Sequence, residues 1–332
     1  MIVTPRRAAI ITTLFFIAGC SGGTPSQSPS LGSPSANAFV HRGVPFAPPV
    51  LRGLVPKKSG KYKTKKSLVF VGDQGTLAVS VYETAKLSTN PSPIAMIHVA
   101  AGCPYGLAAD KKGTLYVADN CPSGSFTGDI EEYAKGSTKL KTTITDGISD
   151  PLGAAIDAEG NLYVSNYPAA ITVYAPGSTS PSETITGGGM VDPFGLALDG
   201  SGDLFIADFG ADAVFEVKAG TTTVQNLNLS GLGEPLGLAF DLSSGYLWES
   251  DGSGDAINVY SLGTSSSPIE TIPGNGFPYA IATENVGKPL GEVVESDLDA
   301  RAVYAYKPDS YSSYAALTNG IETPTGLLIT KP

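Results

Sequence analysis

One motif, Pro-x-Gly-x-Ala-x-Asp, recurs along the chain and constrains its fold more than any other feature. The copies begin at six prolines, namely Pro104, Pro151, Pro193 and Pro235 for four complete copies and Pro278 and Pro324 for two degenerate ones. Successive prolines are 42 to 47 residues apart. A period of this length is typical of repeat architectures, in which one unit cannot bury its apolar faces without its neighbours.

Each copy has the pattern of a four-stranded antiparallel sheet. After the motif, a turn that contains Gly leads into a second apolar run, such as Leu115–Asp119, and third and fourth strands follow, such as residues 171–174 and 183–185. The 40 Gly and 25 Pro residues agree with many short strands joined by tight turns. A sheet with two apolar faces is buried when copies stack radially, so the sequence predicts an all-β fold, a β-propeller.

The two ends of the repeat region complement each other. Residues 68–73 match the second strand of a copy, and residues 324–330 match the first. Joined together, they complete a sixth blade and leave no free radial edge. We therefore predict a six-bladed β-propeller over residues 67–332, with four strands in each blade and closure by strands from both termini.

The motif and the run that follows it, such as Leu-Tyr-Val-Ala-Asp at residues 115–119, resemble the NHL repeat of six-bladed β-propellers. The resemblance covers roughly residues 67–332. It implies the fold but leaves function open, because propellers of this kind serve as binding platforms and related six-bladed enzymes are lactonases and lyases.

The N-terminal segment has the features of a bacterial export signal. Arg6 and Arg7 precede an apolar run at residues 8–18, about half the ~20 residues that a membrane-spanning helix needs. Residues 17–20 read Ile-Ala-Gly-Cys and resemble a lipobox. We therefore expect residues 1–19 to be a lipoprotein signal peptide and acylated Cys20 to hold the chain on the exported side of a cell-envelope membrane. The alternative is an ordinary secretory signal with a cysteine there by chance.

Charge divides the chain into two parts. Residues 1–66 carry ten Lys and Arg and no acid, whereas residues 67–332 carry 11 Lys and Arg and 31 Asp and Glu. We expect a flexible Ser/Pro/Gly tether at residues 20–40 and a basic arm at residues 41–66, followed by a strongly acidic propeller. The arm is either solvated or in contact with anionic lipid head groups. Export argues against a nucleic-acid partner.

Acidic residues gather at one end of the predicted channel. Five of the six second strands end in Asp, and three loops carry an acid directly before the proline of the motif: Asp150, Asp192 and Glu234. Such a mouth suits a hard cation such as Ca²⁺ or a cationic ligand, so these three residues are ligand-binding candidates. The competing interpretation makes the strand-ending acids turn residues that accept backbone N–H bonds.

The second strands of the fifth and sixth blades differ from the others. Where four blades have Val or Ile, these two have Glu249 and Glu295. Period-two alternation places them on the same faces as Asp251 and Asp297, and a lone buried carboxylate is costly. We predict a metal or polar-ligand pocket between blades five and six, with these four acids as its candidate ligands, although the two glutamates need not touch because adjacent blades lie about 10 Å apart. The alternatives are solvent exposure and pairing with a base such as Arg301.

Cys103 and Cys121 flank the first hairpin of the second blade. If Ala109 faces Leu115, uniform antiparallel pairing places the two cysteines opposite each other. The sequence therefore predicts a disulfide, in agreement with an oxidising compartment.

The chain has few groups suited to catalysis. Its two histidines are His41 and His98, and no Ser–His or Cys–His pair is evident, so the sequence indicates no catalytic residue. We expect a cell-envelope lipoprotein whose propeller binds an unidentified protein or small ligand, with Ca²⁺ as the one cofactor suggested. The alternative is a metal-dependent lactonase- or lyase-like enzyme that uses the acidic channel mouth.

Overall fold

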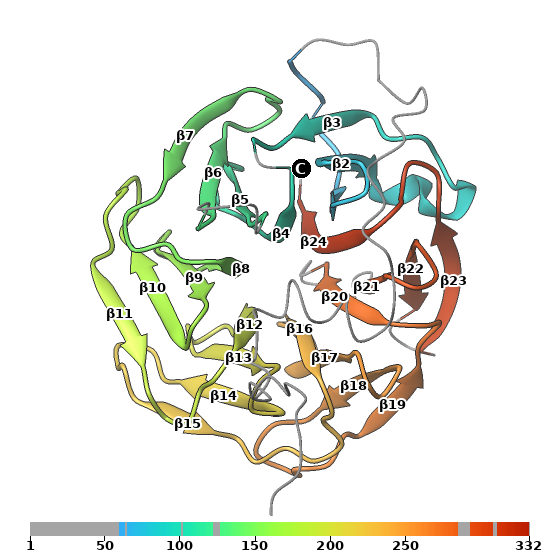
Figure 1. The fold of residues 1–332 in the computed structure, drawn as a ribbon. Helices are drawn as coiled ribbons and strands as arrows, with labels where there is room; N and C mark the ends of the chain where they lie inside the picture. Colours follow the sequence, from blue (N-terminus) through green and yellow to red (C-terminus); the bar gives the residue numbers. More distant parts are fainter. Residues whose placement is uncertain are drawn as a thin grey trace, which may run out of the picture. The chain divides into compact units, whose positions relative to one another are not determined.

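A computed structural model of the chain describes residues 60–63, 65–100, 102–121, 127–284, 293–307 and 311–331. These residues form six four-stranded antiparallel sheets arranged in a ring (Figure 1), which confirms the predicted six-bladed propeller. The predicted signal peptide, Cys20, the tether and most of the basic arm lie outside the described residues. Within the described ranges, no helix has the length and apolarity needed to cross a membrane.

The innermost strand of each blade begins at the proline of the motif and lies nearest the centre of the ring (Figure 1). These strands are β24 (Pro324–Thr330), β4 (Pro104–Ala109), β8 (Pro151–Ile156), β12 (Pro193–Leu198), β16 (Pro235–Asp241) and β20 (Pro278–Thr283), for blades one to six.

Three further strands follow outward in each blade. The second strands are β1 (Leu68–Asp73), β5 (Leu115–Asp119), β9 (Leu162–Asn166), β13 (Leu204–Asp208), β17 (Tyr246–Asp251) and β21 (Val293–Asp297). The third are β2 (Ala78–Glu83), β6 (Asp129–Tyr133), β10 (Ala170–Tyr174), β14 (Ala213–Val217), β18 (Ala256–Tyr260) and β22 (Ala302–Lys307). The outermost are β3 (Ala95–His98), β7 (Leu140–Ile144), β11 (Glu183–Thr186), β15 (Val224–Asn226), β19 (Glu270–Pro273) and β23 (Ser312–Leu317), and a 3₁₀ helix, η1 (Thr84–Thr89), precedes β3.

Strands from opposite ends of the repeat region close the ring, as predicted. In the first blade, β1 lies between β24 and β2 and is antiparallel to both. Leu68 faces Thr330 on one side and Glu83 on the other. The first blade is therefore complete only when the last strand of the chain has joined it.

Every innermost strand carries a β-bulge directly after the proline with which it begins. In the second blade the register shifts between Pro104 and Leu107, and the other five blades shift at the same place. A bulge adds one residue to a strand and redirects a side chain. Here the residue after the proline is buried near the axis, and five of these side chains belong to one apolar cluster: Tyr105, Leu152, Phe194, Leu236 and Tyr279.

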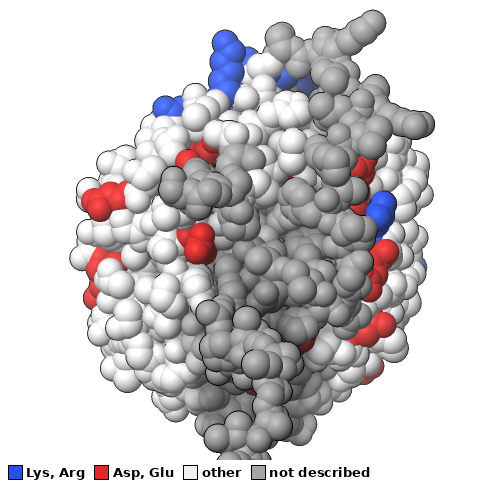
Figure 2. All heavy atoms as spheres, viewed as in Figure 1, with Lys and Arg blue, Asp and Glu red and all other residues white. Residues whose placement is uncertain are grey.

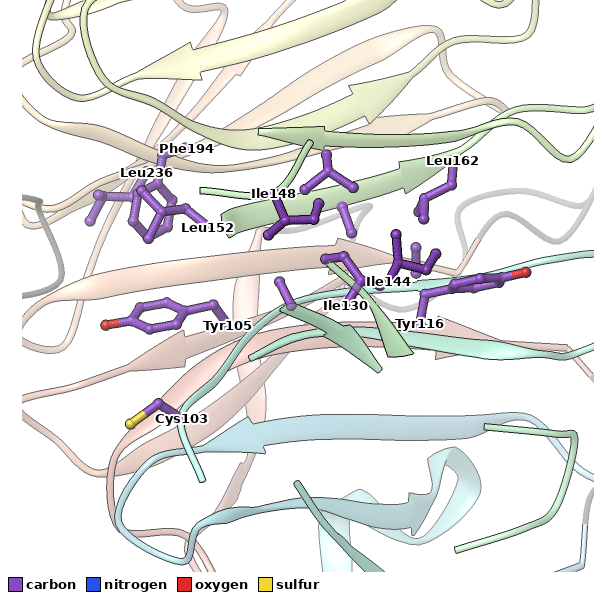
Figure 3. Close-up of a cluster of buried hydrophobic side chains, with 14 of the residues drawn as sticks. Cys103, Tyr105, Tyr116, Ile130, Ile144, Ile148, Leu152, Leu162, Phe194 and Leu236 are labelled. Carbon is purple, nitrogen blue, oxygen red and sulfur yellow. The ribbon is translucent and has the colours of Figure 1, made fainter. Parts of the chain in front are cut away.

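These five residues, the axial plug, fill the channel at its proline end. The rings of Tyr105, Phe194 and Tyr279 come from the second, fourth and sixth blades, yet their centroids are only 5.2 to 6.4 Å apart. Figure 3 shows Tyr105 and Phe194 on the same side of the cluster. Glycine lets the innermost strands of neighbouring blades approach closely, since a Cβ at Gly326 would lie 1.8 Å from the Tyr105 carbonyl oxygen. The remaining cavity beside the plug has a volume of about 60 Å³.

Candidate functional site

The acids that end the second strands hold the loops that lead into the innermost strands. Asp208 accepts the backbone N–H groups of Val191 and Asp192 at 2.8 and 2.9 Å. Bonds to the corresponding loops are made by Asp73, Asp119, Asn166 and Asp251. Asp297 accepts the N–H of Ala300, in the turn that follows it, at 2.7 Å. These bonds confirm the interpretation of the strand-ending acids as backbone acceptors.

The acids before the prolines do not form one group. Asp192 is buried, whereas Asp150 and Glu234 are half-buried. The Asp192 Oδ1 atom has no hydrogen-bond partner in the described part of the chain, and burial together with the nearby charge of Asp208 raises the pKa of Asp192 to about 7. The open acidic mouth predicted at this end of the channel is absent from the described structure, because the axial plug fills it.

Glu249 and Glu295 are both fully buried, so solvent exposure was the wrong alternative for them. Glu249 accepts a bond from the amide of Asn258 at 3.0 Å, and Glu295 lies 3.4 Å from the hydroxyl of Tyr306. Burial raises the pKa of each glutamate well above its ordinary value. No ion pair links either glutamate to Arg301 within the described ranges.

The four acids predicted as a metal pocket are not brought together as a group. Among the described residues, one set of three His, Cys, Asp or Glu residues has ligand atoms within 4.8 Å of one another, and it contains none of Glu249, Asp251, Glu295 and Asp297. Each glutamate instead has a polar neighbour on the third strand of its own blade.

The set that does come together lies in the second blade and was missed at the sequence level. Asp119 on β5 faces Asp129 on β6, and Val117 faces Glu131, so the three carboxyl groups share one face of the sheet. All three residues are buried. Burial, with the charges of Glu131 and Asp119, raises the pKa of Asp129 to about 7. A comparison of the third strands across the six repeats would have singled out Asp129.

Next to this set, the predicted disulfide joins Cys103 and Cys121, whose Cα atoms are 5.1 Å apart. The assumed pairing of Ala109 with Leu115 is correct, but the bulge shifts the register by one residue before Cys103 is reached. The N–H of Asn120 donates to the Cys103 carbonyl at 3.0 Å, which continues the pairing of the two segments toward the disulfide.

At the other end of the channel, where the first hairpin of each blade turns, the ring opens into a funnel of about 220 Å³, which is lined by uncharged residues with mainly apolar side chains and by their backbone polar groups. No charged residue and no histidine is among its described lining residues. The innermost strands contribute their last or penultimate residues to this funnel: Ala109, Ile156, Leu198, Phe240, Thr283 and Ile329. The hairpins around it carry acids at equivalent positions, namely Asp110, Asp157, Asp199 and Asp241, each of which accepts an N–H bond in its own turn.

A larger cavity of about 380 Å³ lies between the first and second blades. Tyr62, at the end of the basic arm, lines it. Its N–H donates to Gly136 at 2.8 Å, and its ring packs edge-on against Phe70. Three lysines also line this cavity: Lys111, Lys135 and Lys331. In the view of Figure 2 the basic side chains gather mainly at the top, over these two blades. The end of the arm is thus fixed to the basic side of the propeller.

No protein-family model and no curated protein sequence matches the chain. Among solved structures, a chain in the crystal structure of the nidogen/laminin complex matches with a TM-score of 0.65 and 20% identity, over 79% of this chain and 97% of that chain. The streptogramin B lyase structure gives a TM-score of 0.48 and 14% identity, over 63% of this chain and 67% of that chain. At 20% identity the first match shows the fold alone, and the chain is a six-bladed β-propeller.

Proposed function

We propose that this chain is a lipid-anchored protein of the bacterial cell envelope, and that its NHL-like propeller binds a protein partner at the funnel. The observation that carries the binding role is the chemistry of the funnel, whose described lining offers apolar side chains and backbone polar groups and holds no titratable group. Its volume of about 220 Å³ is below the range of roughly 300–1,000 Å³ that is usual for small-molecule sites. It suits apolar side chains that project from a protein surface.

The rim indicates the character of the partner. On the side of blades three to five, acidic hairpins such as those at Asp157 and Asp199 flank the funnel, and Leu242 on the next hairpin is 51% exposed. A partner with apolar side chains flanked by Lys or Arg is complementary to this surface. The similar chain comes from the crystal structure of the nidogen/laminin complex, so a propeller of this fold occurs in a protein complex, and this supports the proposal.

Catalysis receives less support from the same residues. An enzyme that uses the acidic mouth needs polar groups that converge on an open pocket. In the described residues the axial plug occupies the proline end, and no titratable side chain lines the funnel. We therefore propose a binding role and not the lactonase- or lyase-like alternative.

Anchoring through Cys20 is tested separately, by growing cells with a radiolabelled or clickable fatty acid. We expect the wild-type chain to take up the label and to sediment with membranes. The Cys20→Ser variant should be exported without label and be released in soluble form. Unlabelled wild-type protein would overturn the anchoring proposal. It would not affect the binding role, which a separate experiment tests.

Partner binding is tested by photo-crosslinking in intact cells that produce the protein. A photoreactive phenylalanine analogue at Phe240, in the funnel, is compared with the same analogue at Leu140, which is 48% exposed on the outermost strand β7. We expect one discrete crosslinked protein from position 240 only, which Leu242→Asp in the same chain abolishes. The same crosslinks from both positions, or none from position 240, would contradict the proposal.

A further inference from the structure

One position in the third strand distinguishes the second blade from the other five. This position faces the last residue of the second strand, and in β6 it holds Asp129. The other blades all have alanine there: Ala78, Ala170, Ala213, Ala256 and Ala302. Packing at this site is therefore satisfied by a methyl group, and a carboxyl group adds the cost of removing it from water. The second blade therefore bears the desolvation cost of the Asp129 carboxyl group although packing does not require that group.

Two more carboxyl groups share the face of the sheet on which Asp129 lies. Asp119 is directly opposite it, and Glu131 follows two residues along the same strand. One carboxylate oxygen from each residue lies within 4.8 Å of the others. Oxygen atoms about 2.3–2.6 Å from one Ca²⁺ ion are at most about 5 Å apart, so this spacing fits a shared ion.

The hydrogen bonds of the group leave one oxygen without a donor. Glu131 accepts bonds from the N–H of Ala100 at 2.9 Å and from the hydroxyl of Tyr133. Asp129 is only 8% exposed, and its Oδ1 atom has no partner in the described part of the chain. In those ranges neither Asp129 nor Glu131 forms an ion pair with Lys or Arg. A buried carboxylate oxygen without a donor needs a proton or a cation.

We propose that Asp119, Asp129 and Glu131 are ligands of a Ca²⁺ ion held inside the second blade. Carboxylate oxygens are the ligands that this hard cation prefers. The site lies within a blade, and its three acids belong neither to the axial plug nor to the lining of the funnel. Asp119 also accepts the N–H of Cys103 at 2.8 Å, so the ion fastens the loop that leads into β4 together with the two strands.

The proposal is tested by thermal unfolding and isothermal titration calorimetry of the full chain in detergent, with CaCl₂ as the only added ligand after EGTA treatment and dialysis. At Ca²⁺ 100-fold above the Kd, the stabilisation of about 2.7 kcal/mol corresponds to a rise in Tm of roughly 5 °C or more. We expect this rise in the wild-type chain and its loss in Asp129→Ala. In EGTA, Asp129→Ala should be at least as stable as wild type, because alanine is the residue that the other blades have.

The matched control is Glu249→Gln, which changes another buried carboxyl group with an unpartnered oxygen, in the fifth blade. This variant should keep the full Ca²⁺ shift. Asp129→Asn repeats the test with minimal change of shape should the alanine variant fail to fold. Absence of both a Tm shift and binding heat in the wild type would overturn the proposal. So would a Ca²⁺ shift that persists in the Asp129 variant, or one that is lost in Glu249→Gln alone.

Discussion

At the scale of single residues, buried hydroxyl groups join neighbouring blades. Ser165, the penultimate residue of β9, accepts the N–H of Gly153 at 2.7 Å and donates to the carbonyl of Phe194, in the next blade, at 2.6 Å. Ser250 makes the same two kinds of bond in the fifth blade. Because the sheets of adjacent blades share no ladder, these hydroxyls provide a hydrogen-bonded link between innermost strands and satisfy a backbone donor at the bulge.

Replacing Ser165 with alanine should therefore destabilise the ring. The change leaves a buried N–H and a buried carbonyl without this partner, and we expect a loss of about 1–3 kcal/mol in the free energy of unfolding, measured in urea. The control is Ser178→Ala, which removes an exposed turn bond to the Ser180 carbonyl and should change stability by less than about 0.5 kcal/mol. Equal losses from the two variants would refute the role assigned to Ser165.

Asp192 should make stability depend on pH. Its pKa is about 7 in the folded chain, against an ordinary value of 3.8, because burial and the charge of Asp208 disfavour the ionised form. The folded state therefore holds a proton that the unfolded state releases. The stabilisation from this proton is complete below pH 3.8 and is lost as the pH rises to about 7.

The Asp192→Asn variant removes this titration. We expect its Tm to exceed that of the wild type most at pH 8 and least at pH 4, as measured by differential scanning calorimetry. Asp146→Asn, at an exposed position, controls for the loss of one negative charge. A difference in Tm between Asp192→Asn and wild type that stays constant from pH 4 to pH 8 would rule out the shifted carboxyl group.

At the scale of strands and blades, the repeat motif was sufficient to predict the architecture but not the local register. The spacing of the prolines and the matching end segments predicted the six closed blades, because a period-two apolar pattern defines strands wherever they occur. The bulge after Pro104 adds a residue without interrupting that pattern, so its effect on Tyr105 could not be foreseen. The axial plug depends on this bulge. The sequence instead predicted an acidic mouth at the proline end of the channel.

Pairing across strands limited the prediction of the site in the same way. Glu249 was conspicuous within its own strand, yet its neighbour Asn258 is defined by the register with β18. The carboxyl groups of Asp119 and Asp129 meet only because β5 and β6 pair at those positions. When the second strands of the six repeats are compared only with one another, the contacts that their residues make with the third strands cannot be seen.

The glycine that follows the bulge in five of the six blades should be sensitive to the smallest side chain; the sixth blade has Ala280 there. A Cβ at Gly153 would lie 2.1 Å from the carbonyl oxygen of Phe194, a backbone atom that moves only with its blade. We expect Gly153→Ala to cost about 1–3 kcal/mol of unfolding free energy through overpacking. Gly200→Ala is the control, since its Cβ meets only a Leu242 methyl at 3.7 Å, and it should be nearly neutral. Comparable urea midpoints for the two variants would contradict the close approach of the blades.

At the scale of the whole molecule, charge is separated between the two sides of the ring. Blades three to five, residues 151–273, carry 15 acids and one base. Blades one and two with the end of the arm, residues 61–144 and 324–331, carry 11 bases and seven acids. Because the arm joins the propeller at the basic side, an anionic membrane near the proposed anchor attracts those blades and repels the opposite ones.

This separation predicts weak, salt-dependent binding of the unlipidated Cys20→Ser chain to vesicles that contain phosphatidylglycerol. A lysine close to an anionic surface contributes about 1 kcal/mol, so Lys111→Ala and Lys135→Ala should each reduce the vesicle association constant by roughly fivefold in co-sedimentation at low salt. Lys218→Ala, in the fourth blade, is the matched control and should leave binding unchanged, since its ammonium group pairs with Asp203 and Glu216. Equal losses from all three variants would show that net charge alone drives the association. Binding that is insensitive to salt would exclude an electrostatic contact, because exposed charges are screened beyond about 8 Å at 0.15 M salt.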